Sequence, residues 1–254
     1  MNPFIRLEQL IGSDSLERLK NARVAVFGLG AVGSYAVEAL ARAGIGYLRL
    51  IDYDDIKPSN CNRQLYALHS TIHQAKIDVA RARVLDINPA CIVECHRTFV
   101  DNESVDALLA SGLDMAIDAI DGLLSKIVLL THAVNKGVPI MSSMGAGGKR
   151  NPALIKTGDI SETIVCPLAR YVRKRLRRQG IVSGIRCVYS TEVSNIGTPL
   201  ETDEDTTQTR GRLRTPIGSI SYITGMFGLL IASEVINALL DQNGRLYKEL
   251  DNKI

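Results

Sequence analysis

The chain has 254 residues, of which 46% are hydrophobic and 22% charged, and its formal net charge is +3. These values are ordinary for a globular protein, and so small a net charge does not by itself indicate a nucleic-acid binder. The five cysteines are few, odd in number and scattered, which argues against a disulfide framework, and the absence of a Cys-x-x-Cys pair argues against a zinc site. Since the chain shows no signal-peptide pattern and its most apolar stretch, 217–240, contains glycines and polar residues, we expect a soluble cytoplasmic protein without a membrane span.

Short apolar strands alternate with helices in the first part of the chain. The predicted order is strand 24–27, helix 31–43, strand 47–51, helix 75–85, strand 91–95, helix 105–110, strand 115–117, helix 123–136 and strand 138–141. Such alternation predicts an α/β fold: a Rossmann-like, mostly parallel sheet with helices on both faces.

The second part of the chain is less regular. It is predicted to contain a basic helix at 168–179, a strand at 187–190, a loop rich in Gly, Thr and acids at 195–212 and an apolar core helix within 217–240. We therefore expect a single domain over 1–254. Its nucleotide-binding core would span about 13–150, and 151–254 would form a substrate-facing, dimer-forming extension.

A Gly-x-Gly-x-x-Gly motif, Gly28-Leu-Gly30-Ala31-Val-Gly33, lies between the first strand and the first helix. Glycines there allow a tight turn, a close approach to phosphate and close helix–strand packing, and the helix N-terminus provides N–H donors. Asp52 ends the next strand, where a carboxylate can accept from a ribose hydroxyl. These features alone fit NAD as well as ATP.

Further polar residues separate the two nucleotides. Asn60, Arg63 and Gln64 follow the acidic strand end, and Lys76 begins the next helix. Two cations on the phosphate side suit ATP, because charge builds on the pyrophosphate leaving group during attack at a triphosphate. Asp121, after the fourth strand, is suited to hold Mg²⁺ against the phosphates.

Together these motifs resemble those of the ubiquitin-activating, thiamine- and molybdopterin-biosynthesis adenylating enzymes. The resemblance rests on Asp52-x-Asp54, Asn-x-x-Arg-Gln, Lys76 and Asp118-Ala-Ile-Asp121. It implies that Gly28, Gly30, Ala31, Gly33, Asp52, Asp54, Asn60, Arg63, Gln64, Lys76 and Asp121 bind Mg-ATP. It also implies that Arg6 reaches into the ATP site of a partner subunit, so that Arg6, Arg63, Lys76 and Asp121 act together in catalysis in a homodimer.

Segments of the second part resemble one branch of these enzymes, the tRNA threonylcarbamoyladenosine (t6A) dehydratases. They are Thr163-Ile-Val-Cys-Pro-Leu-Ala and Arg186-Cys-Val-Tyr-Ser-Thr-Glu192. That resemblance implies adenylation of the t6A carboxylate in tRNA, followed by intramolecular cyclisation. It leaves open a cysteine-desulfurase or sulfur-acceptor system as an accessory partner. Because a neighbouring group can attack the activated carboxyl, no enzyme thiol is required, although Cys61 lies in the phosphate-side loop.

The helix at 168–179 carries six cations and no acid. Leu168, Val172 and Leu176 recur every four residues and predict a buried stripe. Although runs of charge are usually solvated surface, in a tRNA-modifying enzyme this helix is expected to contact the phosphate backbone through Arg170, Arg173, Lys174, Arg177 and Arg178.

The sequence leaves three alternative functions open. Adenylation of the C-terminal carboxylate of a ubiquitin-like sulfur carrier is the nearest, and the missing zinc cysteines count against it. An NAD-dependent oxidoreductase would use the glycine motif but not Arg63, Lys76 and Asp121 together. A non-catalytic nucleotide sensor would likewise leave these residues without a role.

Overall fold

The computed structural model of the chain describes residues 2–110, 112–195 and 217–241. The described strands are β1 (Arg23–Phe27), β2 (Tyr47–Ile51), β3 (Ile92–His96), β4 (Met115–Asp118), β5 (Ile140–Ser143), β6 (Ile155–Asp159) and β7 (Arg186–Ser190). The described α-helices are α1 (Ile5–Ile11), α2 (Ser13–Asn21), α3 (Gly33–Arg42), α4 (Lys76–Ile87), α5 (Val105–Leu108), α6 (Leu123–Lys136), α7 (Pro167–Arg177) and α8 (Ser221–Leu240).

The strands form one seven-stranded sheet in the order β3-β2-β1-β4-β5-β7-β6. All neighbouring pairs are parallel except β6 and β7, which are antiparallel. The predicted α/β fold with a mostly parallel sheet is therefore confirmed. The strands of the second part, β6 and β7, belong to the same sheet as β1, the strand that leads into the glycine motif.

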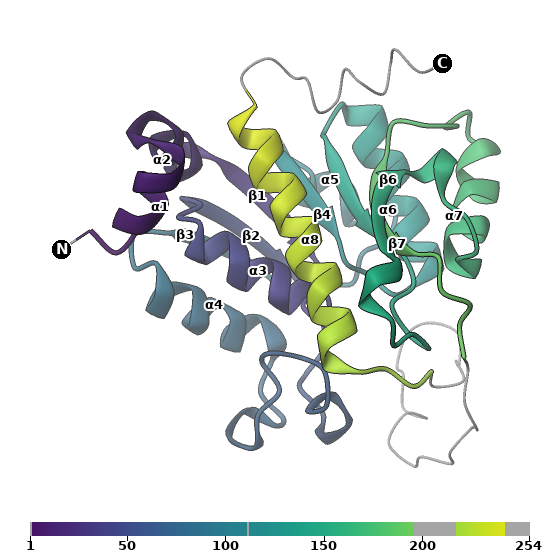
Figure 1. The fold of residues 1–254 in the computed structure, drawn as a ribbon, viewed down its shortest axis with the longest axis horizontal. Coiled ribbons are helices and arrows are strands. Elements are labelled where there is room, and N and C mark those ends of the chain that lie inside the picture. Colours follow the sequence, from purple (N-terminus) through teal and green to yellow (C-terminus); the bar gives the residue numbers. More distant parts are fainter. Residues whose placement is uncertain (1, 111, 196–216, 242–254) are drawn as a thin grey trace.

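Helices cover both faces of the sheet (Figure 1). Helices α3, α4 and α8 pack in one apolar cluster with the sheet, and α5, α6 and α7 belong to a second cluster on the opposite face. Helix α8 is long and apolar enough to cross a membrane by length and composition. Its Ile223, Phe227, Ile231 and Val235 are nevertheless fully buried against α3 and the sheet, which identifies it as a core helix.

Two α-helices and one strand among the described residues were not predicted from the sequence. Helices α1 and α2 precede the sheet, and α1 buries none of its residues, so it shows little of the apolar pattern that marks a core helix. Strand β6 reads Ile-Lys-Thr-Gly-Asp and lies at the sheet edge, which explains why it lacks the apolar run of a central parallel strand. The loop predicted at 195–212 lies outside the described residues except for Asn195.

The strand order reverses between β1 and β4. From β1 the chain proceeds to β2 and then β3 on one side, and β4 then pairs with β1 on the other side. In open α/β sheets such a switch point, at the carboxyl ends of the strands, is where ligands bind. A nucleotide site is therefore expected in the loops after β1, β2 and β4.

Candidate functional site

The glycine motif forms a tight loop at this switch point. Gly28 has φ +91°, and a Cβ added there would lie 2.8 Å from the carbonyl oxygen of Ala119, in the loop after β4. A Cβ at Gly33 would lie 1.8 Å from the Gly28 carbonyl oxygen, so α3 can begin there only with glycine. At Gly30 the nearest atom would be 3.8 Å away, on the Gln64 side chain. The protein fills the space at the first and third glycines but leaves room over the second.

Asp52 braces the glycine loop from the end of β2. One carboxylate oxygen accepts a hydrogen bond from the Leu29 amide at 2.6 Å, and the other accepts from the Asp54 amide at 2.9 Å. Because burial disfavours the charged form, it raises the pKa of the Asp52 carboxyl above its ordinary value, and nearby Lys76 opposes part of that shift. Asp52 therefore shapes the loop itself, in addition to the ribose contact predicted for it.

Lys76 is a buried cation at the start of α4. Only 5% of the residue is exposed, and its ammonium lies 3.0 Å from a carboxylate oxygen of Asp54. The Lys76 amide also donates to the Asp54 carbonyl oxygen at 3.1 Å. A buried ammonium whose printed partner is one half-exposed carboxylate is the kind of cation that suits the phosphate contact predicted for Lys76.

The phosphate-side loop places its polar residues in three different environments. Asn60 is buried, and its side-chain oxygen accepts from the Lys57 amide at 3.2 Å. Gln64 is buried beside Gly30. Arg63 is partly exposed and folds back on its own loop, donating to the Ser59 carbonyl oxygen at 2.7 Å and to the Asn62 side chain at 2.9 Å. Arg63 must therefore exchange these partners to reach a nucleotide.

Asp121 is exposed in the loop just after β4. Ala119, in the same loop, lies close to Gly28. Among the described residues, no group of three or more His, Cys, Asp or Glu side chains could hold a metal ion by itself. The donor chemistry thus fits Mg²⁺ bound through one carboxylate together with nucleotide phosphates, which is how proteins often hold this ion, and does not fit an all-protein metal cage.

A buried network next to Asp121 was missed from the sequence. Asp118 and Lys126 form an ion pair of 2.5 Å with both side chains fully buried, and the Ser142 hydroxyl donates to the same Asp118 oxygen at 2.5 Å. A signal was available, because Lys126 falls on the apolar side of α6 between Leu123 and Leu130. A lysine on a core-facing stripe needs a buried partner.

Arg6 does not join these residues within one chain. It is exposed on α1, and α2 follows directly and runs into the amino end of β1, at the sheet edge opposite the candidate site. In Figure 1, α1 and α2 lie at the upper left, whereas the loops between β2 and α4 extend from the bottom of the molecule. If Arg6 acts on a nucleotide, it does so in another subunit.

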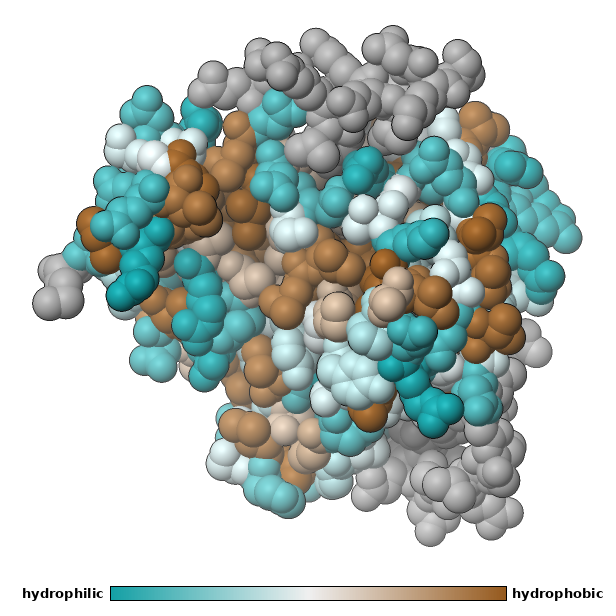
Figure 2. All heavy atoms as spheres, viewed as in Figure 1, coloured by the Kyte–Doolittle hydropathy of each residue, from teal (hydrophilic) through white to brown (hydrophobic). Residues whose placement is uncertain are grey.

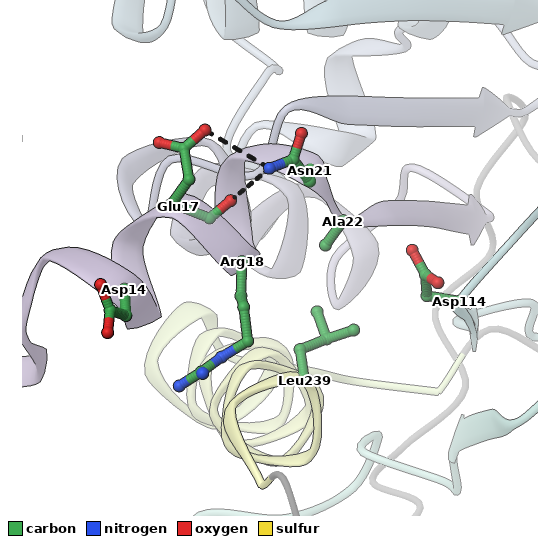
Figure 3. A pocket seen from close by; sticks show the side chains of 7 residues that line it. All are labelled: Asp14, Glu17, Arg18, Asn21, Ala22, Asp114 and Leu239. Atoms are coloured by element: carbon green, nitrogen blue, oxygen red, sulfur yellow. Dashed lines mark hydrogen bonds between the residues drawn. The ribbon is translucent and has the colours of Figure 1, made fainter.

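Surface hollows formed by described residues also lie outside the nucleotide loops. One of about 520 Å³ lies at the amino edge of the sheet, among α2, the end of α8 and Asp114, so its position does not suit the predicted chemistry (Figure 3). Another, of about 250 Å³, lies after the carboxyl end of β5 and is lined by Gly148, Lys149, Arg150, Asn195, Gly218, Ser219 and Ile220. Asn62 links it to the phosphate-side loop by donating to the Ser219 carbonyl oxygen at 3.1 Å.

Helix α7 begins beside the loop after β5, because a Cβ at Gly145 would lie 3.6 Å from Cys166 Sγ. Its inner side consists of Ala169, Val172 and Leu176, all buried. Leu168, predicted as the first residue of this stripe, is only partly buried but packs against the same apolar cluster. Arg170, Lys174, Arg177 and Arg178 are exposed, but Arg173 donates to the Thr163 carbonyl oxygen at 2.6 Å and to its hydroxyl. Arg173 therefore helps to hold α7 in place.

The model of the ThiF family matches residues 4–252. The chain belongs to the ThiF family. Within it, the chain is 39% identical to the tRNA threonylcarbamoyladenosine dehydratase of Bacillus subtilis and 38% identical to that of Haemophilus influenzae, covering 94% and 93% of this chain and 95% and 93% of those proteins. The ThiF-family chain is therefore a member of the dehydratase branch, as the sequence motifs predicted.

Solved structures of this ThiF-family branch agree. The Escherichia coli tRNA N6-threonylcarbamoyladenosine dehydratase in complex with ATP matches with a TM-score of 0.82 and 32% identity, over 95% of both chains. A complex of that enzyme with AMP matches equally well. By contrast, an adenylyltransferase and sulfurtransferase of Drosophila willistoni is 34% identical over only 49% of this chain and 27% of its own length. The similarity to the dehydratases therefore covers nearly the whole chain, whereas the similarity to the sulfurtransferase covers about half of it.

Proposed function

We propose that this chain is an ATP-dependent tRNA t6A dehydratase that binds Mg-ATP in the loops after β1, β2 and β4. The observation that carries the proposal is the buried Lys76 beside Asp54, next to a glycine loop with open space over Gly30. That arrangement suits a triphosphate, and full-length similarity to dehydratases, one of them solved with ATP, supplies the substrate.

The reaction proceeds in two steps. First, a carboxylate oxygen of t6A attacks the α-phosphorus of ATP, and the bond to the β-phosphate breaks to release pyrophosphate with its electron pair. The carbamoyl group of the same nucleoside then attacks the activated carboxyl carbon and gives up a proton, and AMP leaves with the former carboxylate oxygen. The net change in the nucleoside is loss of one water. Because the nucleophile is already held in the substrate, its effective concentration is high and no enzyme nucleophile is needed.

This chain's own residues bind and polarise the nucleotide. Asp52 and Asn60 shape the ribose and phosphate loops, Gln64 lies beside Gly30, and Lys76 and Arg63 neutralise charge on the departing pyrophosphate. We assign Asp121 to Mg²⁺, which neutralises phosphate charge when bound.

The proposal is tested by incubating the purified protein with Mg-ATP and tRNA bearing t6A, followed by mass spectrometry of the nucleosides. We expect t6A to lose one water, with one AMP formed per conversion. ATP binding without any change in the nucleoside would reject the dehydratase function. In that case, ATP-dependent adenylation of a ubiquitin-like carrier protein ending in Gly-Gly would be the next activity to measure.

Cys61 is the one exposed cysteine of the chain, and the proposed mechanism gives it no covalent role. Cys91 is buried, and burial raises the pKa of its thiol to about 11. We expect Cys61→Ser to retain activity within about twofold, because the attacking group belongs to the substrate. Steady-state AMP release measures this. A loss of a hundredfold or more, with ATP binding unchanged, would indicate a covalent intermediate on Cys61.

We further propose that the chain acts as a homodimer. Arg6 lies far from the candidate site of its own chain, and α8 carries an outward apolar side made of Tyr222, Met226 and Leu229. These side chains are 45%, 37% and 49% exposed, and Figure 2 shows hydrophobic atoms gathered on the face of the molecule that α8 crosses. An apolar patch of this kind is typical of a protein interface.

We also propose that residues 1–254 form a single domain and that the protein is cytoplasmic. A sulfur-transfer partner stays a prediction.

We propose that the outer side of α7 binds the tRNA backbone. Arg170→Gln, Lys174→Gln, Arg177→Gln and Arg178→Gln together should reduce the slope of log affinity against log salt by about 3, since each phosphate contact contributes about 0.7 to 0.9. Arg173 is left unchanged because it holds Thr163. Filter binding of t6A-bearing tRNA at several salt concentrations measures the slope.

The matched control changes four exposed cations on helices α2, α3 and α4: Lys20→Gln, Arg42→Gln, Arg81→Gln and Arg83→Gln. It alters the net charge equally but leaves α7 intact, so its salt slope should stay within about 1 of the wild-type slope. Equal effects in both variants would show that overall charge, and not α7, attracts the tRNA.

A further inference from the structure

The ion pair between Asp118 and Lys126 joins three elements at the carboxyl edge of the sheet. Asp118 ends β4 and Lys126 lies in the first turns of α6. The Lys126 ammonium donates to Asp118 at 2.5 Å and also to the carbonyl oxygen of Ser143, which ends β5, at 3.0 Å. The Ser142 hydroxyl completes the network. The pair therefore fixes the ends of β4 and β5 and the start of α6 relative to one another.

The pair also fixes the loop that carries Asp121. The second oxygen of Asp118 accepts a hydrogen bond from the Ile120 amide at 3.1 Å. The preceding residue, Ala119, donates its amide to the Phe27 carbonyl oxygen at 2.8 Å and lies against Gly28. One carboxylate thus sets the path of the chain between the glycine loop and Asp121.

Stability alone does not explain this pair. Both side chains are fully buried, with 0% of their surface in contact with solvent, so both charges have lost their hydration. Burying two charges is so costly that well-packed apolar residues of similar volume are often as good for the free energy of folding, or better. What apolar residues cannot provide is a set of directed hydrogen bonds to Ile120, Ser142 and Ser143.

We propose that Lys126 is a positioning residue for the nucleotide reaction: through Asp118 it holds the loop that carries Asp121 against the glycine loop. This inference rests on the proposed role of Asp121 with Mg-ATP. It assigns Lys126 no contact with substrate. It predicts that the pair controls how strongly Mg²⁺ tightens ATP binding, beyond any effect on folding.

The test replaces the pair by apolar residues of similar size, Asp118→Leu with Lys126→Met. ATP affinity is measured by calorimetry with and without Mg²⁺, together with kcat, KM for ATP and thermal unfolding. We expect cooperative unfolding and a metal-free ATP affinity within about threefold of wild type, while the enhancement by Mg²⁺ falls about tenfold. The value of kcat should fall more than KM changes.

A matched control removes the ion pair between Arg186 and Glu234, whose atoms lie 2.6 Å apart where β7 begins and packs on α8. Arg186→Met with Glu234→Leu should leave the Mg²⁺ enhancement and kcat at wild-type values, because this pair touches no loop of the site. Ser142→Ala provides a milder change within the network. It should lower the Mg²⁺ enhancement about twofold to threefold without loss of fold, since one hydrogen bond to Asp118 is removed.

The outcomes separate the inference from the function on which it rests. No Mg²⁺ enhancement in the wild-type protein would overturn the metal role of Asp121, and this inference with it. Normal enhancement in wild type and in a folded double variant would overturn the inference alone. Equal weakening of ATP binding with and without Mg²⁺ would do the same, since it indicates a general structural role. If the double variant does not fold, unchanged enhancement in Ser142→Ala overturns the inference and a reduced one supports it.

Discussion

Asp121→Asn is expected to lower kcat for t6A dehydration by about a thousandfold, which corresponds to about 4 kcal/mol of transition-state stabilisation. Asparagine keeps the size of the side chain but offers a neutral oxygen in place of a carboxylate, and hard divalent cations prefer the latter. Because Asp121 is exposed, the variant should unfold at the wild-type temperature. AMP release under saturating Mg-ATP and tRNA measures kcat, and scanning calorimetry measures the unfolding temperature.

A matched control for this variant is Asp106→Asn, which removes the same charge from an exposed carboxylate on α5 that pairs with His132 and Lys136. Its kcat should stay within about twofold of wild type, as for a surface change away from the site. If Asp121→Asn also stays within tenfold of wild type, Asp121 is not the metal ligand, and Asp54, which lies against Lys76, becomes the carboxylate to test.

Mixing two inactive variants is expected to restore activity if Arg6 acts across the dimer. Arg6→Ala and Lys76→Ala alone should each lose at least about a hundredfold in kcat, since both cations would neutralise phosphate charge in the transition state. In a mixed dimer, one site combines the intact Lys76 of one subunit with the intact Arg6 of the other. The second site carries both changes. Statistical mixing in equal amounts should therefore restore about one quarter of wild-type activity.

The control mixture combines Lys76→Ala with Arg63→Ala. Both residues belong to the same chain's loops after β2, so no mixed dimer contains an intact site, whereas each site can still receive an intact Arg6. This mixture should stay inactive. If Arg6→Ala with Lys76→Ala also stays inactive although mixed dimers are isolated by two affinity tags, Arg6 does not act in the partner's site.

The sequence alone predicted the sheet because buried parallel strands leave a strong pattern. Strand β2 and helix α6 occupy the predicted residues, since their apolar runs end at acids or glycine. It also predicted which residue types gather at the carboxyl edge, because parallel strands end at the same side of a sheet. The glycine motif also predicted the tight turn after β1, and the structure gives the physical reason: no residue with a side chain fits at Gly28 or Gly33.

Other features depend on partners far apart in the sequence. The Lys126 ammonium is a buried charge only because β4 and β5 place Asp118 and the Ser143 carbonyl oxygen around it. Arg173 reads as one more surface cation of α7, and its bonds to Thr163 appear only when that turn packs beside the helix. Strand β6 pairs with β7 across a long connection, which a local pattern does not record.

The amino-acid sequence by itself therefore determined the α/β fold and the adenylating family, and it predicts the residue types of the nucleotide site, because local periodicity and loop motifs encode them. Only the tertiary structure decided which polar groups are buried, which of them hold one another, and that Arg6 lies at the opposite edge of the sheet from its own chain's site. The physical reason is that burial and hydrogen bonding are properties of the packed chain, set by neighbours that are distant along the sequence.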